Sequence, residues 1–168
     1  MKRPELGEYA ESYKGYVDLV TESNGIQALR DSKREALDLW AKWPIAKQDH
    51  RYAEGKWTPK EIVQHIIDTE RVFGYRALAF GRSDTTELPG FDHNAYVDQS
   101  RDIKRSWHDL MEEFEMVRNG SILLFESLES QSTNAGIANG VGISVRALCF
   151  VSAGHTRHHL NVLRNKYL

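Results

Sequence analysis

The chain has 168 residues, of which 40% are hydrophobic and 27% charged, which suffices for one globular domain with a buried core. Its 22 Lys and Arg against 24 Asp and Glu give a formal net charge of -2, so it lacks the positive excess that nucleic acid or anionic lipid attracts. No segment resembles a signal peptide or is long and apolar enough to span a bilayer, so we expect a cytoplasmic protein without nucleic-acid or membrane partners.

Helical spacing begins close to the N-terminus. Apolar and aromatic residues recur at three- and four-residue steps over residues 8–23, and the same pattern resumes over residues 26–43. The Asn24-Gly25 pair interrupts or bends this segment. Pro44 ends the second helix, and the polar residues 46–56 predict a loop.

The most complete helix start is the stretch WTPKEI at residues 57–62. Thr58 suits the N-cap, the proline fills the first helical position, and Glu61 completes a capping box, with the flanking Trp and Ile placed as a hydrophobic staple. The apolar stripe that follows predicts a helix over residues 59–80, with His65 on its inner face.

The second half of the chain repeats this alternation of loop and helix. Residues 81–98 predict a long loop, and residues 100–128 carry the stripe of a third long helix. Glycines punctuate a turn over residues 136–142, and Ser144 caps a last helix over residues 145–166.

Four long amphipathic helices and no convincing strand predict an all-α fold, a four-helix bundle forming a single domain over residues 1–168. Cys149, the only cysteine, lies in an apolar run. We therefore expect a buried thiol in a reducing compartment rather than a disulfide or a nucleophile.

The stretch GHTRHHLNVLRNKYL at residues 154–168 holds three of the seven histidines. On a helix, His155 and His159 are about 40° apart, whereas the adjacent His158 and His159 are about 100° apart. Two imidazoles four residues apart can hold one metal ion, as in helical HExxH sites. His65, on the inward face of another helix, would supply a third ligand.

Three neutral nitrogen donors suit zinc or nickel better than calcium or magnesium. They leave positions open for water or substrate, as in a catalytic site, where the metal could lower the pKa of a bound water or thiol. Each histidine alone also fits a hydrogen-bonded core residue, so the metal hypothesis depends on the combination. We expect His158 beside the ligands or at the surface, and His50, His93 and His108 in solvent.

The runs KWTPKEIVQHIIDTERVFGYRALAFGR, LPGFDHNAYV and GHTRHHLNVLR together resemble the DinB/YfiT-like superfamily, bacterial metal-dependent hydrolases and thiol S-transferases. The similarity runs from about residue 26 to the end. The resemblance implies a four-helix bundle whose metal, commonly zinc or nickel, is held by one histidine of the second helix and two of the last. By motif these ligands are His65, His155 and His159, the same residues that the helical spacing selects.

The resemblance also implies chemistry on thiols. Characterised members add a low-molecular-weight thiol, such as bacillithiol, mycothiol or glutathione, to an electrophile, and a divalent cation that stabilises a thiolate suits this step. We therefore expect a metal-dependent S-transferase with a thiol cosubstrate. Two alternatives stay open: a metal-dependent hydrolase with metal-bound water as the nucleophile, and a non-enzymatic stress-response module with a structural or adventitious metal.

Four charged residues are candidates for supporting roles. Asp68 and Glu70 could accept a proton, and Asp68 could instead orient a ligand imidazole, although a surface charge suits it equally. Arg76 and Arg157 could pair with a carboxylate of the thiol cosubstrate, with a solvated helix face as the simpler alternative for each.

The remaining expectations concern the pocket mouth and assembly. Asp92, His93 and Tyr96, in the loop that resembles the family's second motif, would line the mouth of the pocket, whereas Trp57 serves the helix start. We expect a small-molecule substrate and a homodimer, since isologous pairing is common among such bundles.

Overall fold

The computed structural model describes residues 1–101 and 103–168. Its helices are α1 (Glu11–Asp18), α2 (Gly25–Trp40), α3 (Pro59–Gly81), α4 (His93–Ser100), α5 (Trp107–Ser127) and α6 (Val145–Tyr167), with short 3₁₀ turns at Ile45–Lys47 and Glu129–Gln131 and two strands, β1 (Ala135–Ala138) and β2 (Val141–Ser144). Within the described ranges, no helix is long and apolar enough to cross a membrane.

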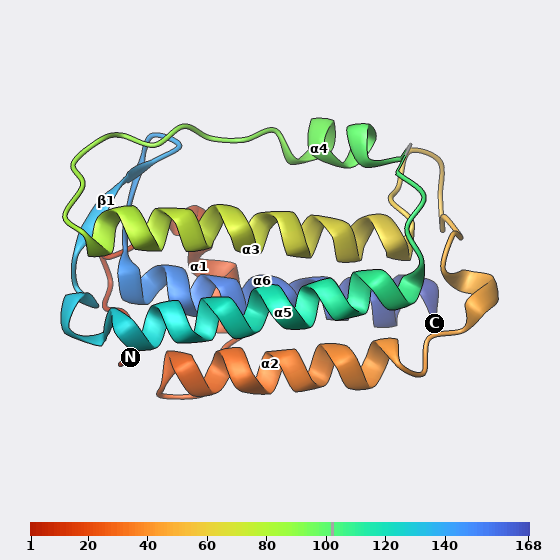
Figure 1. Cartoon of the computed structure of the whole chain (residues 1–168), viewed down its shortest axis with the longest axis horizontal. Coiled ribbons are helices and arrows are strands. Elements are labelled where there is room, and N and C mark those ends of the chain that lie inside the picture. Colours follow the sequence, from red (N-terminus) through yellow and green to blue (C-terminus); the bar gives the residue numbers. More distant parts are fainter. Residues whose placement is uncertain (102) are drawn as a thin grey trace.

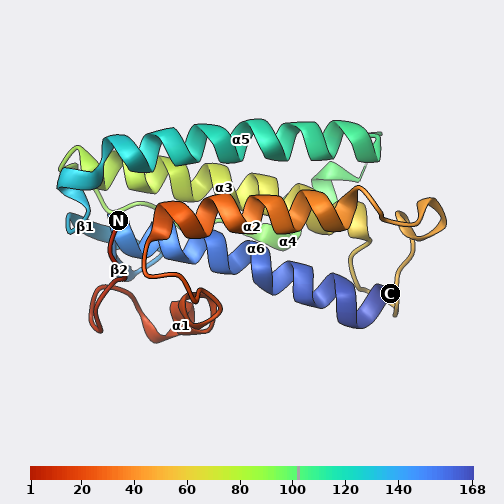
Figure 2. The same ribbon diagram turned by 90° about the horizontal axis from the view of Figure 1, so that it is seen from below.

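The four long helices α2, α3, α5 and α6 lie along the long axis of the molecule (Figures 1 and 2). α3 packs against α5 and α6, and α2 packs against the same two helices from the other side. α3 and α5 run in one direction and α2 and α6 in the other, so the connection between α3 and α5 returns along the whole bundle (Figure 1). The predicted four-helix bundle is confirmed, with α1 added against α6 and α4 against α3.

Side-chain caps set the helix starts. Thr58 and Glu61 form the predicted capping box of α3, and the Ser144 hydroxyl accepts a hydrogen bond from the backbone N–H of Ala147 at the start of α6. The Asn24 side chain accepts from two backbone N–H groups of α2. The Asn24-Gly25 pair is therefore a helix start rather than a bend.

The third long helix starts later than the sequence pattern predicts. α5 begins at Trp107, where Ser106 and Asp109 form a second capping box, and not near residue 100. Ile103, expected in the buried stripe, is 63% exposed. The short helix α4 (His93–Ser100) begins inside the segment 81–98 that was expected to be a loop and ends two residues beyond it.

The expectation of no strand is wrong for residues 135–144. Two four-residue strands pair antiparallel, with Ala135 opposite Ser144 and Ala138 opposite Val141. The turn between them is Asn139-Gly140, with φ values of 54° and 73°, the left-handed backbone of a type I′ hairpin turn. The Asn-Gly pair was the signal for this hairpin, but the strands themselves are too short and glycine-rich to show alternation.

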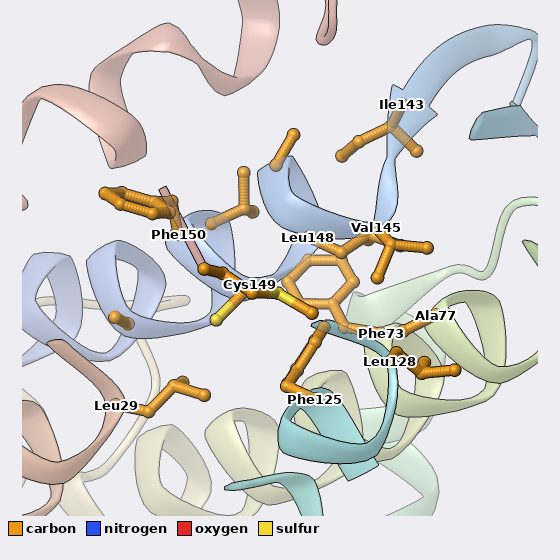
Figure 3. Close-up of a cluster of buried hydrophobic side chains, with 14 of the residues drawn as sticks. Leu29, Phe73, Ala77, Phe125, Leu128, Ile143, Val145, Leu148, Cys149 and Phe150 are labelled. Atoms are coloured by element: carbon orange, nitrogen blue, oxygen red, sulfur yellow. The ribbon is translucent and has the colours of Figure 1, made fainter. Parts of the chain in front are cut away.

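The hydrophobic core consists of two clusters along the bundle. The first surrounds Cys149 and Phe150 in the first half of α6, where side chains of α2, α3 and α5 also meet (Figure 3). The second surrounds Trp40 and Phe114 at the other end. Cys149 is fully buried, and burial raises the pKa of its thiol, so the prediction of a buried thiol is confirmed.

A set of buried polar side chains, the polar layer, joins all four bundle helices: Ser32 of α2, Glu70 of α3, Arg118 of α5, and Ser152 and Thr156 of α6. The Arg118 guanidinium donates to both carboxylate oxygens of Glu70, at 2.7 and 2.9 Å. It also donates to the hydroxyls of Ser32 and Thr156, each at 2.8 Å. The layer is therefore satisfied internally, as a buried charge requires.

Candidate metal centre

The packing of α3 against α6 brings three histidines together. The Nε2 atom of His155 lies 3.1 Å from the Nε2 atom of His65, which is 90 residues away in sequence, and 3.1 Å from the Nε2 atom of His159. The ligand nitrogens of all three residues lie within 4.8 Å of one another. The predicted convergence of these rings is confirmed.

The three imidazoles are buried. Burial, together with the like charge of neighbouring histidines, lowers the pKa of His65 to about 4. The same causes lower the pKa values of His155 and His159 well below the ordinary value for histidine. All three rings are therefore neutral at pH 7, which is the form that binds a metal ion.

The arrangement of nitrogen atoms fits a shared cation. Two histidine nitrogens bound to one tetrahedral zinc ion lie roughly 3.3 Å apart, close to the 3.1 Å observed here. The Nδ1 atom of His159 is buried without a partner among the described residues, and the Nδ1 atom of His65 has only the Thr69 hydroxyl, 3.5 Å away. The Nδ1 atoms of His65 and His159 therefore have at most one weak hydrogen bond, whereas the Nε2 atoms of the three histidines converge on one point.

The cluster opens onto a cavity of about 360 Å³, here called the histidine cavity. Its wall is mainly aromatic, and among the described residues no Asp or Glu contributes to it. The lining residues are Tyr13, Tyr16, Trp57, His65, Thr69, Phe73, Arg76, Phe91, His93, Asn139, His155, His158 and His159. A cavity that combines aromatic surface with a few convergent polar groups is the usual form of a small-molecule site.

Trp57 and His93 form the wall next to the cluster. The Trp57 ring lies 4.8 Å, centroid to centroid, from the His65 ring and stacks on His159 at 6.5 Å. Trp57 is thus a wall of the site as well as part of the α3 start. The ring of His93 lies 5.6 Å from that of His65, so His93 lines the cavity although its side chain is exposed, as expected from the sequence.

The other two residues expected at the pocket mouth have different positions. Asp92 is the N-cap of α4, where its carboxylate accepts hydrogen bonds from two backbone N–H groups and so fixes the start of the helix that carries His93. Tyr96 packs against Phe91, 5.3 Å between centroids, and is half exposed. Only His93 of the three lines the histidine cavity.

Tyr16 of α1 is a wall residue that the sequence pattern does not reveal. Its ring meets those of His155 and His158 edge-on, at centroid distances of 5.4 and 5.5 Å. Burial raises the pKa of Tyr16, so its hydroxyl keeps its proton and can donate a hydrogen bond. A β-carbon on Gly154 would lie 1.9 Å from the Tyr16 carbonyl oxygen, so glycine at that position permits α1 to approach the site.

Gly154→Ala is expected to destabilise the protein by about 1–3 kcal/mol, because the added methyl group meets backbone rather than a flexible side chain. Urea unfolding followed by circular dichroism measures the change. Gly120→Ala is the matched control: it lies in α5 with open space around its Cα and should stabilise by roughly 0.5–1 kcal/mol. Equal effects of the two substitutions would contradict the close packing of α1.

The two acids proposed from sequence as proton acceptors do not line the histidine cavity. Glu70 is buried in the polar layer, where Arg118 binds both of its oxygens. Asp68 accepts a hydrogen bond from the side chain of Gln64 and lines a separate cavity under α4. Burial raises the pKa of Asp68, but its position, like that of Glu70, gives it no access to the cluster. The placement of these two acids in the reaction is therefore not supported by the structure.

The two arginines expected to bind the cosubstrate are also separated. Arg76 is buried and lines the histidine cavity. Arg157 does not line it, because its guanidinium donates to the carboxylates of Glu22 and Glu35 and so links α6 to α2 and to the segment before α2. The expected role of Arg157 in cosubstrate binding is therefore corrected to a structural one.

Arg157→Ala is expected to destabilise the fold by about 2 kcal/mol through loss of charge-assisted hydrogen bonds, without loss of metal. Arg157 holds the pKa of Glu22 at about 2, below its usual 4.5. This stabilisation is complete above pH 4.5 and disappears as the pH falls toward 2. Denaturant titrations at several pH values should show a smaller acid loss of stability in the variant. An identical acid profile would contradict the assignment.

A family model described as the DinB superfamily matches residues 28–163. The fold is similar to that of YfiT from Bacillus subtilis, with a TM-score of 0.66 and 15% sequence identity over 96% of this chain and 91% of that one. That protein is described as a probable metal-dependent hydrolase with an unusual four-helix bundle topology. None of the curated proteins matches the chain.

Proposed function

This chain belongs to the DinB superfamily, and on that premise we propose that it is a metal-dependent enzyme that transfers a low-molecular-weight thiol to an electrophilic small molecule. The proposed ligands are His65, His155 and His159, and the proposed ion is zinc or nickel, which neutral nitrogen donors favour. When bound, such an ion lowers the pKa of a thiol and stabilises the thiolate.

The charge of the histidine cavity carries this proposal. The three ligands are neutral, Arg76 adds a buried positive charge, and none of the described Asp and Glu residues lines the cavity. A divalent ion would therefore bring positive charge that no carboxylate of the cavity wall compensates. An anionic ligand such as a thiolate supplies the missing negative charge.

The wall residues provide the other requirements of the transfer. The rings of Trp57 and Phe73 offer apolar surface to an electrophile. His93 and His158 line the cavity beside the cluster and are placed to accept the proton of the thiol. The protonated Tyr16 hydroxyl can donate a hydrogen bond to the leaving or developing anion.

A metal-dependent hydrolase is the second candidate, supported by the description of the structurally similar YfiT. Hydrolysis needs a proton acceptor close to the attacking water. Since Asp68 and Glu70 lie outside the histidine cavity, His93 or His158 would have to serve. This reaction therefore uses the same cavity with a different nucleophile.

The test begins with elemental analysis of untagged protein, for which we expect one zinc or nickel ion per chain. Conjugation of a model electrophile is then assayed with a panel of low-molecular-weight thiols, alongside ester and amide hydrolysis without thiol. Thiol-dependent conjugation supports the transferase. Thiol-independent turnover that disappears in His155→Ala would favour the hydrolase, and the absence of stoichiometric metal would exclude both.

A further inference from the structure

We propose that the histidine cavity takes an elongated small molecule with a carboxylate at one end, and that Arg76 binds this carboxylate away from the metal cluster. The inference rests on the proposed function and deepens it by naming a chemical class of substrate or cosubstrate. It depends on the burial of Arg76, on the charges around it, and on its position along α3.

Arg76 is a buried cation without a carboxylate partner in the described part of the chain. Its side chain is only 3% exposed and lines the histidine cavity. The hydrogen bond found for it runs from Nη2 to the backbone carbonyl of Pro89, over 3.0 Å. A guanidinium has five N–H donors, so most of them stay available toward the cavity.

The other arginines with little exposure are all neutralised by the protein. Arg118 pairs with Glu70, Arg146 with Glu8, and Arg157 with Glu22 and Glu35. A buried charge is costly unless it is paired, and this chain follows that rule at each of these positions. Arg76 departs from it inside the cavity, which indicates that an external anion completes the site.

The geometry of α3 determines the shape of the ligand. His65, Thr69, Phe73 and Arg76 all line the histidine cavity from one face of this helix. Eleven residues separate the first from the last, which corresponds to about 16 Å along the helix axis. Phe73 lies between them, with its ring 6.0 Å from that of His155. A fitting molecule therefore has a reactive group near the cluster, an apolar middle and an anionic end.

A carboxylate suits Arg76 because the planar guanidinium can donate two parallel hydrogen bonds to its oxygens. The bond to Pro89 does not prevent this, since it uses one nitrogen only. It also ties Arg76 to the segment that carries Phe91 and His93, two further wall residues. A bound carboxylate would thus lie against the segment that contributes these two wall residues.

The test compares ligands that differ only at the far end. Metal-loaded wild type and Arg76→Gln are titrated calorimetrically with straight-chain ω-mercapto acids of increasing length and with the matching ω-mercapto alcohols. In wild type the acid is expected to bind on the order of tenfold to a hundredfold more tightly than the alcohol once the chain spans both sites. In Arg76→Gln this ratio should fall to about one.

Two further variants control the comparison. Arg82→Gln removes an exposed arginine at the end of the same helix and should keep the wild-type ratio. Arg76→Lys retains the charge without the paired geometry and should keep part of the preference. If acid and alcohol weaken equally in Arg76→Gln, Arg76 only anchors the Pro89 segment, and the inference is overturned.

A metal-free arm distinguishes this inference from the proposed function. Chelator-treated protein is titrated with an alkyl carboxylate and the matching alkyl alcohol. A carboxylate preference that Arg76→Gln removes would support the anion site even in a protein that binds no thiol. Thiol binding to metal-loaded protein without any acid preference would leave the proposed function intact and overturn the inference. A competition experiment locates the two ends of the ligand. If the alkyl carboxylate competes with the ω-mercapto acid but not with mercaptoethanol, both ends of the ligand lie in one cavity. Simultaneous binding of the alkyl carboxylate and the ω-mercapto acid would contradict a single site.

Discussion

Replacing His155 with Ala is expected to abolish stoichiometric metal binding while leaving the helical content nearly unchanged. The Nε2 atom of His155 lies 3.1 Å from both partner nitrogens, so its loss removes the centre of the donor set. The affinity should fall by more than the roughly 10–100-fold that the loss of an outer hydrogen-bond partner costs. The fold persists because two apolar clusters supply the core. Elemental analysis and competition with a chromophoric chelator measure the loss.

His158→Ala is the control for this experiment. His158 is adjacent in sequence to His159 and lines the same cavity, but it is exposed and not one of the three converging rings. It should therefore retain the metal, whereas His159→Ala should lose it as His155→Ala does. Full occupancy in His155→Ala would refute the proposed ligand set.

Glu70→Ala is expected to lower the free energy of unfolding by about 3–5 kcal/mol, because it leaves the Arg118 charge buried without a counter-ion. Both groups are almost completely buried, and the guanidinium binds both carboxylate oxygens. Urea unfolding followed by tryptophan fluorescence measures the change. Under conditions where the variant remains folded, its metal content should equal that of the wild type.

A double substitution separates the missing charge from the missing packing. Glu70→Leu combined with Arg118→Met removes the ion pair altogether and should be less destabilising than Glu70→Ala alone, since no unpaired charge remains. If Glu70→Ala unfolds like the wild type but loses all turnover, Glu70 has a chemical role after all. The assignment of this residue to the polar layer would then be wrong.

The convergence of the three histidines was predictable because local periodicity places them. His155 and His159 are four residues apart on a strongly signalled helix, and His65 lies one turn beyond a complete capping box. Inward-facing stripes in a bundle must meet, so the three rings converge without further information. The same reasoning identified the four long helices and the burial of Cys149.

The remaining wall and supporting residues depend on tertiary contacts that the sequence pattern does not encode. Tyr16 reaches the site because Gly154 lets one backbone approach another. Glu70 and Arg157 are held outside the histidine cavity by ion pairs with residues distant in sequence, Arg118 and Glu22 respectively. Charge and helix position alone do not distinguish a paired acid from a free one, so these roles could not be assigned without the fold.

The division of the ligands between α3 and α6 has a consequence for biosynthesis. While a nascent chain has emerged only as far as α5, it presents His65 alone, and the faces of α2 and α3 that later cover α6 stay open. Closure of the core and assembly of the three-histidine cluster must therefore occur together, late, and over a large sequence separation, which is a slow type of event in folding. With the proposed ligand set, the choice of metal would then be decided after translation of α6, when the last helix docks.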